Sequence, residues 1–239
     1  MAREYIDMSG IMKIQQRRDE LKNPKTEETK HTEVWLKDGE QLFCTSVASG
    51  ADDDKLVDEL WMYTFRIGNR FRSLLQDSSV DATGVPEDTR ASHRFGLWVY
   101  AHYIFHVDKR NDEWEEVETP SGVKMFKEVI DDYRIVQLAF GRGDYVWNQL
   151  VEIYGDWGSL NKGVIRVKRN GIGLDTSYAI MATTKKEKIP AARKAEASDL
   201  QTIKEYNLER YGKPLTEEDM DMMTIHNTAN GHSSEETTY

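Results

Sequence analysis

The sequence predicts a mainly β fold with α insertions, an OB-like antiparallel barrel that has one main helix and flexible N- and C-terminal tails. Three observations lead to this prediction. Short segments of alternating apolar and polar residues, separated by Gly, Asn and Asp, recur between residues 32 and 183, as in antiparallel β proteins. One stretch, residues 145–154, has helical periodicity instead. Residues 1–31 have little apolar periodicity, and residues 227–239 are polar.

Composition limits the classes of protein that fit. The 239 residues carry a net charge of -10 with 38% hydrophobic residues, which suits one good-sized domain with polar extensions. The single cysteine, Cys44, excludes an intramolecular disulfide framework and fits a reducing compartment. No run approaches the roughly 18–20 apolar residues of a membrane helix. We therefore expect a soluble intracellular protein with no membrane partner.

The charge is strongly segregated along the chain. Residues 111–159 carry 4 basic and 11 acidic residues, a net of -7. Residues 160–194 carry 9 basic and 2 acidic residues, a net of +7, and residues 195–239 carry 3 and 10, a net of -7. Local potential governs what binds, so the basic block is a candidate for contact with a polyanion. The alternative is chance patchiness in a highly charged protein.

The chain divides into three predicted regions. Residues 1–31 read as a flexible N-terminal arm, residues 32–190 as the core, and residues 191–239 as a C-terminal region that is helical at first and then acidic and partly disordered. Within the third region, residues 199–211 and a capping signal at Thr216 predict two short helices.

The first predicted strands follow the arm. Residues 34–36 form a short strand, residues 37–40 a turn and residues 41–48 the returning strand. Three consecutive aspartates, Asp52 to Asp54, lie in the next loop, but neighbouring carboxylates point in different directions, so we expect no metal there.

A second β segment covers residues 60–75 and is interrupted at Gly68. Three arginines alternate with its apolar residues and form a basic stripe: Arg66, Arg70 and Arg72. The polar stretch that follows, residues 76–92, is predicted to be a long loop.

Residues 94–107 have the clearest strand pattern in the sequence. Alternation predicts one core face, made of Phe95, Leu97, Val99, Ala101, Tyr103, Phe105 and Val107. The opposite face would carry Arg94, Trp98, Tyr100, His102, Ile104 and His106. Two aromatic rings beside an arginine suit base stacking. Equally, another layer of the protein could cover them, and the pattern does not decide between the two.

Residues 123–126 and 133–140 are predicted as two further strands, with a turn-rich connection before them and the main helix after them. A β-hairpin over residues 164–181 comes next. Alternation places Arg166 and Lys168 on one of its faces, Arg169 precedes the glycine turn, and Tyr178 lies on the returning strand. A basic strand with an aromatic partner suits a nucleic-acid backbone, although a solvated hairpin has the same pattern.

These segments, in this order over residues 32–183, resemble phage single-stranded DNA-binding proteins of the helix-destabilising OB-fold type found in T-even and other tailed phages. The resemblance rests on VWLKDGEQLFCTSV, RIGNRFRSLL, RFGLWVYAHYI, GRGDYVWNQLVEIYGDWGSL and VIRVKRNGIGLDTSYAIM. Its most specific part is the basic strand followed by Gly171, Gly173, Leu174, Thr176 and Tyr178. Several such proteins hold zinc through cysteines, but residues 76–93 contain none. We therefore predict no metal and no other cofactor.

The resemblance implies a non-enzymatic protein that coats single-stranded DNA during phage replication, recombination and repair, in the cytoplasm of the infected host. It implies an acidic C-terminal tail that contacts replication or recombination proteins, and self-association along DNA is compatible with it. Predicted phosphate contacts are Arg66, Arg70, Arg72, Arg94, Arg166, Lys168 and Arg169, and predicted stacking rings are Trp98, Tyr100 and Tyr178.

Two alternatives belong to other classes. A phage interaction protein that binds a host or viral polymerase through its acidic surfaces would need no basic groove. A metal-dependent nuclease would use Asp52 to Asp54 or the acidic pair Asp131 and Asp132, but these lack a lysine at nuclease-like spacing. Incubation with labelled single strands and Mg²⁺ would reveal such an activity.

Overall fold

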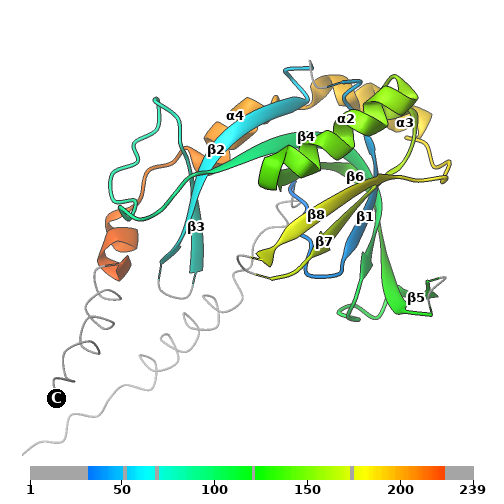
Figure 1. Cartoon of the computed structure of the whole chain (residues 1–239), viewed down its shortest axis with the longest axis horizontal. Coiled ribbons are helices and arrows are strands. Elements are labelled where there is room, and N and C mark those ends of the chain that lie inside the picture. The colour runs from blue at the N-terminus through cyan, green and yellow to red at the C-terminus, as the bar shows by residue number, and fades with distance from the viewer. Residues whose placement is uncertain (1–31, 51–52, 68–69, 120–121, 173–174, 224–239) are drawn as a thin grey trace, which may run out of the picture. The chain divides into compact units, whose positions relative to one another are not determined.

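In the part of the chain that the structure describes, eight strands pair into one antiparallel sheet. The computed structural model describes residues 32–50, 53–67, 70–119, 122–172 and 175–223, and the described residues from Glu33 onward form one unit (Figure 1). The strands are β1 (Gln41–Ser46), β2 (Val57–Ile67), β3 (Arg70–Leu75), β4 (Ser92–His106), β5 (Glu115–Glu118), β6 (Lys124–Ala139), β7 (Ile165–Asn170) and β8 (Ser177–Ala182). Predictions for the arm, the last residues of the tail, Asp52, Gly173 and Leu174 lie outside the described residues.

β4 is the centre of the sheet. One of its edges pairs with β6 along almost its whole length, and its other edge pairs with β2 and then with β1. The strand order is β3-β2-β4-β1-β7-β8, with β6 on β4 and β5 on β6. The predicted mainly β, antiparallel class is confirmed. The OB-like barrel is not, because the sheet is not closed.

A bulge in β4 changes which side chains share a face. Opposite β1, the two-residue step from Ala101 to Tyr103 matches the single step from Cys44 to Phe43, and the pairing with β6 shifts at the same place. As a result, Ile104 joins Ala101 in the main core, whereas Tyr103 and Phe105 pack together on the opposite face. The prediction of one continuous apolar face from Phe95 to Val107 is therefore wrong beyond Ala101. Strict alternation holds only where the ladder is regular.

The two strands predicted at residues 123–126 and 133–140 are parts of the single strand β6. Asp131, with φ 43, lies near the irregularity and lets the strand continue past it. The sequence predicts a turn-rich connection where the structure has β5. The sequence of β5, EEVE, is acidic and mostly exposed. It forms a strand because it pairs with β6, and no apolar pattern marks it in the sequence.

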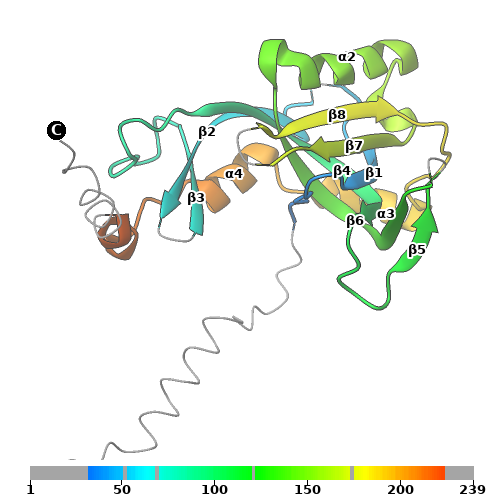
Figure 2. The same cartoon turned by 60° about the horizontal axis from the view of Figure 1, so that its bottom comes forward.

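Helices cover both faces of the sheet. Helix α2 (Tyr145–Trp157), which contains the predicted main helix, buries Val146, Leu150 and Ile153 against the principal core. A covering segment packs on the other face, which we name the outer face. It contains α3 (Ala191–Lys194), the 3-10 helix Ala195–Asp199 and α4 (Ile203–Tyr211). Figure 2 shows α2 on one side of β7 and β8 and α3 and α4 on the other.

Local signals specify α4 closely. Thr202 and Glu205 form a reciprocal capping box at its start, and Thr216 and Asp219 exchange the same kind of bonds before the helical residues 217–223. Ile203 then packs directly on the glycine of β4: a Cβ on Gly96 would lie 2.7 Å from Ile203 Cγ2. The helical part of residues 191–239 is thus integral to the fold. No helix among the described residues is long and apolar enough to cross a bilayer.

Candidate nucleic-acid interface

The ten residues predicted to contact DNA fall in three places. The β2–β3 hairpin carries Arg66, Arg70 and Arg72. Arg94, Arg169 and Tyr178 lie at a seam where residues 33–36 run between β6 and the β7–β8 hairpin. The outer face carries Trp98, Tyr100, Arg166 and Lys168. No single groove unites all of them.

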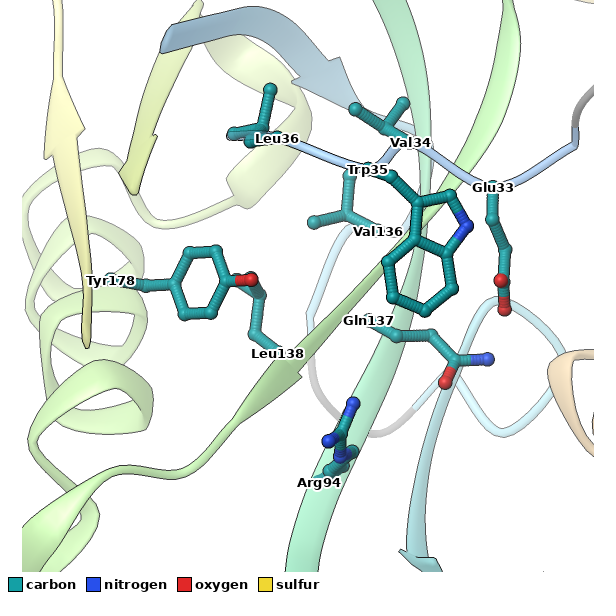
Figure 3. Close-up of a pocket in the computed structure, with 9 residues that line it drawn as sticks. All are labelled: Glu33, Val34, Trp35, Leu36, Arg94, Val136, Gln137, Leu138 and Tyr178. Carbon is teal, nitrogen blue, oxygen red and sulfur yellow. The ribbon is translucent and has the colours of Figure 1, made fainter. Parts of the chain in front are cut away.

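The seam holds a narrow pocket, which we name the seam pocket. It is lined by Glu33, Val34, Trp35, Leu36, Arg94, Val136, Gln137, Leu138 and Tyr178. Figure 3 shows the rings of Trp35 and Tyr178 on two sides of it with the Arg94 side chain below them. Its volume is about 20 Å³, which is enough for a water molecule but not for a nucleobase. A base could therefore stack only at the mouth of the pocket.

Trp35 provides the surface at that mouth, because it is 60% exposed. The main chain beside it is fixed by a hydrogen bond from Val34 N to Ile135 O of 2.9 Å. Arg94 is half-buried on β4, and its Nε donates to Ser92 Oγ at 3.0 Å, which orients the guanidinium at the pocket. An exposed ring and a positioned cation thus line the same pocket, a combination that single-strand-binding proteins use.

Arg169 and Tyr178 support this site from β7 and β8, where they are directly paired. Arg169 Nη1 donates to Leu36 O at 2.6 Å and its Nη2 donates to Thr176 Oγ1 at 3.1 Å. Its guanidinium is therefore engaged within the protein. It acts as a positioning residue that ties residues 33–36 to the β7–β8 hairpin, not as an exposed phosphate contact.

The hairpin arginines differ among themselves. Arg66 and Arg70 are exposed, and Phe71, paired with Arg66, is 79% exposed. Arg72 Nη2 instead donates to Lys213 O at 3.2 Å. Arg94 pairs with Leu60 of β2, so Arg66 lies six residues farther along that strand, roughly 20 Å away. The β7–β8 turn points toward this hairpin in both views (Figures 1 and 2).

Trp98 and Tyr100 are not exposed platforms. They are 4% and 1% exposed beneath the covering segment, and Trp98 Nε1 donates to Gln201 O at 2.8 Å. Of the two alternatives left open by the sequence, burial under another layer is the one found in this structure. Strand periodicity shows which side chains share a face, but not what packs on that face.

The outer-face cations lie farther along the same side of the sheet. Arg166 is half-buried, and its Nη1 and Nη2 contact Gln41 Oε1 at 3.5 Å and Met181 Sδ at 3.1 Å. Lys168 is half-buried opposite Gln41. Sequence reasoning missed Trp35, which it placed in a short strand. It also missed the outer-face rings of Phe43, Tyr103 and Phe105, because no sequence signal marked the bulge.

A buried carboxylate connects the seam pocket to α4. Glu33 is 6% exposed, and Tyr211 Oη lies 2.7 and 2.6 Å from its two oxygens. Burial raises the pKa of Glu33, while the Tyr211 hydrogen bond and the charges of Arg210 and Arg94 oppose that shift. Between the ordinary value of 4.5 and the raised pKa, the folded protein therefore binds more protons than the unfolded chain.

This linkage predicts a pH dependence that Glu33→Gln removes. The contribution of Glu33 to stability is present below its ordinary pKa and is lost as pH rises through the raised one. The amide of the variant does not ionise. We expect the Tm of the wild type, relative to the variant, to fall as pH rises from about 4.5 to 7. A Tm difference that stays constant over this range contradicts the assignment.

Other polar clusters in the described residues are structural. No group of three or more His, Cys, Asp or Glu side chains there could hold a metal ion. His106 is held by Glu40 at 3.0 Å and Glu128 at 2.8 Å on its two ring nitrogens, and Arg110 pairs with Glu40. Cys44 is fully buried, which raises the pKa of its thiol. His106, Glu40 and Cys44 are buried, and we take the seam as the candidate site.

No protein-family model, curated protein or solved structure matches the chain. The resemblance to phage single-stranded DNA-binding proteins stays a prediction from the sequence motifs.

Proposed function

We propose that this protein binds and coats single-stranded DNA without sequence specificity, as phage proteins of the helix-destabilising OB-fold type do in replication, recombination and repair. The observation that carries the proposal is the exposed ring of Trp35 beside Arg94 at the seam pocket. Base–aromatic stacking tolerates any base, because every base has a π-face. In this proposal the protein is not an enzyme and needs no cofactor.

The proposed path of the strand runs from the seam toward the β2–β3 hairpin. Trp35 and Tyr178 stack on bases, and Arg94, Arg66 and Arg70 neutralise phosphates. The small volume of the seam pocket supports an extended ligand over a compact one, since a small molecule would have little surface to bury there. Phe71, exposed on the hairpin, provides a further ring along this path.

An OB-like architecture is part of the proposal. Residues 33–36 hydrogen-bond to the free edge of β6 through Val34 and are held to β7 by Arg169. They lie in the gap that a closed barrel would fill with strand pairing. In OB folds the exposed strands beside such a gap commonly bind single strands.

The proposed setting is the cytoplasm of an infected bacterium. There, acidic residues at the end of the chain contact replication or recombination proteins, and neighbouring molecules associate along the DNA. The net charge of -7 over residues 195–239 supports the partner role, because it cannot itself attract a polyanion.

A titration of fluorescein-labelled oligo-dT, followed by anisotropy in a salt series, tests the proposal. We expect tighter binding to oligo-dT than to duplex of the same length. The logarithm of the affinity should fall by roughly 0.7 per log unit of salt for each phosphate contacted. Three contacts would lower the affinity roughly 20-fold between about 50 and 200 mM salt. Binding that is absent or independent of salt would contradict the proposal and favour a polymerase-binding protein.

A further inference from the structure

The outer face of the sheet carries an aromatic cluster that no predicted contact uses. Phe43 and Tyr103 stack with ring centroids 4.9 Å apart and an interplanar angle of 23°. Phe105 lies 5.2 Å from each of them. Phe43 of β1 and Tyr103 of β4 are directly paired, so the rings project from the same side of adjacent strands. We name these three rings the outer cluster.

The cluster is rimmed by cations in strand register. Arg166 of β7 is directly paired with Phe43, and Lys127 of β6 is directly paired with Phe105. The ammonium of Lys127 is 4.8 Å from the centroid of the Tyr103 ring. Rings flanked by positive side chains on adjacent strands have the composition of a single-strand binding face.

Lys185 lies over all three rings of the cluster. Phe43 and Tyr103 are each 5% exposed, and the ammonium of Lys185 lies 5.0, 4.9 and 6.0 Å from the ring centroids of Phe43, Tyr103 and Phe105. Lys185 is itself exposed and belongs to residues 183–190, which form neither helix nor strand. Glu187 of the same stretch accepts a hydrogen bond from Tyr103 Oη at 3.5 Å.

The contact that closes the cluster is weak enough to exchange. An exposed cation–π contact changes an equilibrium by roughly 2- to 5-fold, whereas a base stacked on an aromatic ring changes affinity by roughly 5- to 150-fold. There is also room beside it. A cavity of about 410 Å³ lies between the outer face and the covering segment, lined among others by Thr45, Tyr133 and Glu187.

We propose that the outer cluster is a second base-stacking subsite for single-stranded DNA, closed by Lys185 and opened when that ammonium moves from the rings to a phosphate. This inference rests on the proposed function. It adds a subsite on the face opposite α2, separate from the seam.

The test compares Tyr103→Leu and Tyr103→Phe on oligo-dT and on an abasic oligomer of equal length. We expect Tyr103→Leu to weaken oligo-dT binding by roughly 5-fold or more and Tyr103→Phe, which keeps the ring, to bind as the wild type does. All three proteins should bind the abasic oligomer equally, because it offers phosphates without bases. If Tyr103→Leu binds oligo-dT as tightly as the wild type does while Trp35→Ala binds it more weakly, the proposed subsite is wrong and the proposed function stands. No binding by the wild type overturns both proposals.

Lys185→Met provides a second test that does not disturb the core. The variant lacks one phosphate contact, so the slope of the logarithm of oligo-dT affinity against the logarithm of salt concentration should be shallower by roughly 0.7. Lys186→Met, at the adjacent exposed position, is the matched control and should keep the wild-type slope. Identical slopes for the wild type and both variants overturn the proposed role of Lys185.

Discussion

Replacing Ile203 with alanine is expected to lower the free energy of unfolding by about 2–5 kcal/mol. Ile203 is fully buried and packs with Trp98, Tyr100, Tyr133 and Ile135 under the covering segment. Its side chain also fills the space above Gly96, where a Cβ would lie 2.7 Å from it. Neighbours on β4 and β6 are fixed by strand pairing, so the cavity cannot collapse easily.

Urea unfolding measures this effect, and Lys204→Ala is its control. Lys204 follows Ile203 in α4 and is exposed, so its truncation should change stability by less than about 0.5 kcal/mol. Two variants of equal stability would show that α4 contributes little to the fold. The covering segment would then be a loose attachment to the outer face.

Much of the fold is readable from the sequence. The hairpin at β7 and β8, the long strand β4 and the helix α2 have strong periodicity, and the glycine turn is visible directly. Gly171, with φ 81, reverses the chain there. These predictions succeeded because local pattern and tertiary environment agree at those elements.

The errors have two physical causes. Bulges are set by the ladder rather than by residue type, so the change of face after Ala101 left no mark in the sequence. Long-range packing is equally invisible: nothing in the β4 pattern indicated that residues more than 90 positions later would cover Trp98. For the same reason the sequence predicts Arg169 as a phosphate contact, whereas in the structure its guanidinium donates to the carbonyl of Leu36 and acts as a positioning residue.

The candidate site was predicted in part. Arg94 and Tyr178 do meet at one pocket, as two of the ten predicted residues. The sequence places Trp35, the most exposed ring there, in a short strand with Val34 and Leu36. An exposed tryptophan between apolar neighbours becomes visible as a surface feature only once the strand edges are known.

Trp35→Ala is expected to weaken oligo-dT binding by about 1–3 kcal/mol, roughly 5- to 150-fold. The indole is 60% exposed, so its truncation removes a stacking surface without opening the core. Arg94, held through Ser92, keeps its position in the variant, so the phosphate contact and the salt slope should be unchanged. Loss of base stacking, which lowers affinity at an unchanged salt slope, can therefore be distinguished from loss of a phosphate contact, which also lowers the slope.

The affinity of Trp35→Ala for oligo-dT, measured beside Tyr154→Ala, tests the central claim most directly. Tyr154 is an aromatic residue of α2 with 44% exposure, and it does not line the seam pocket. We predict that Trp35→Ala loses at least roughly 5-fold in affinity, while Tyr154→Ala binds like the wild type. Equal affinities for the two variants would contradict the assignment of the seam as the place where an unpaired strand binds.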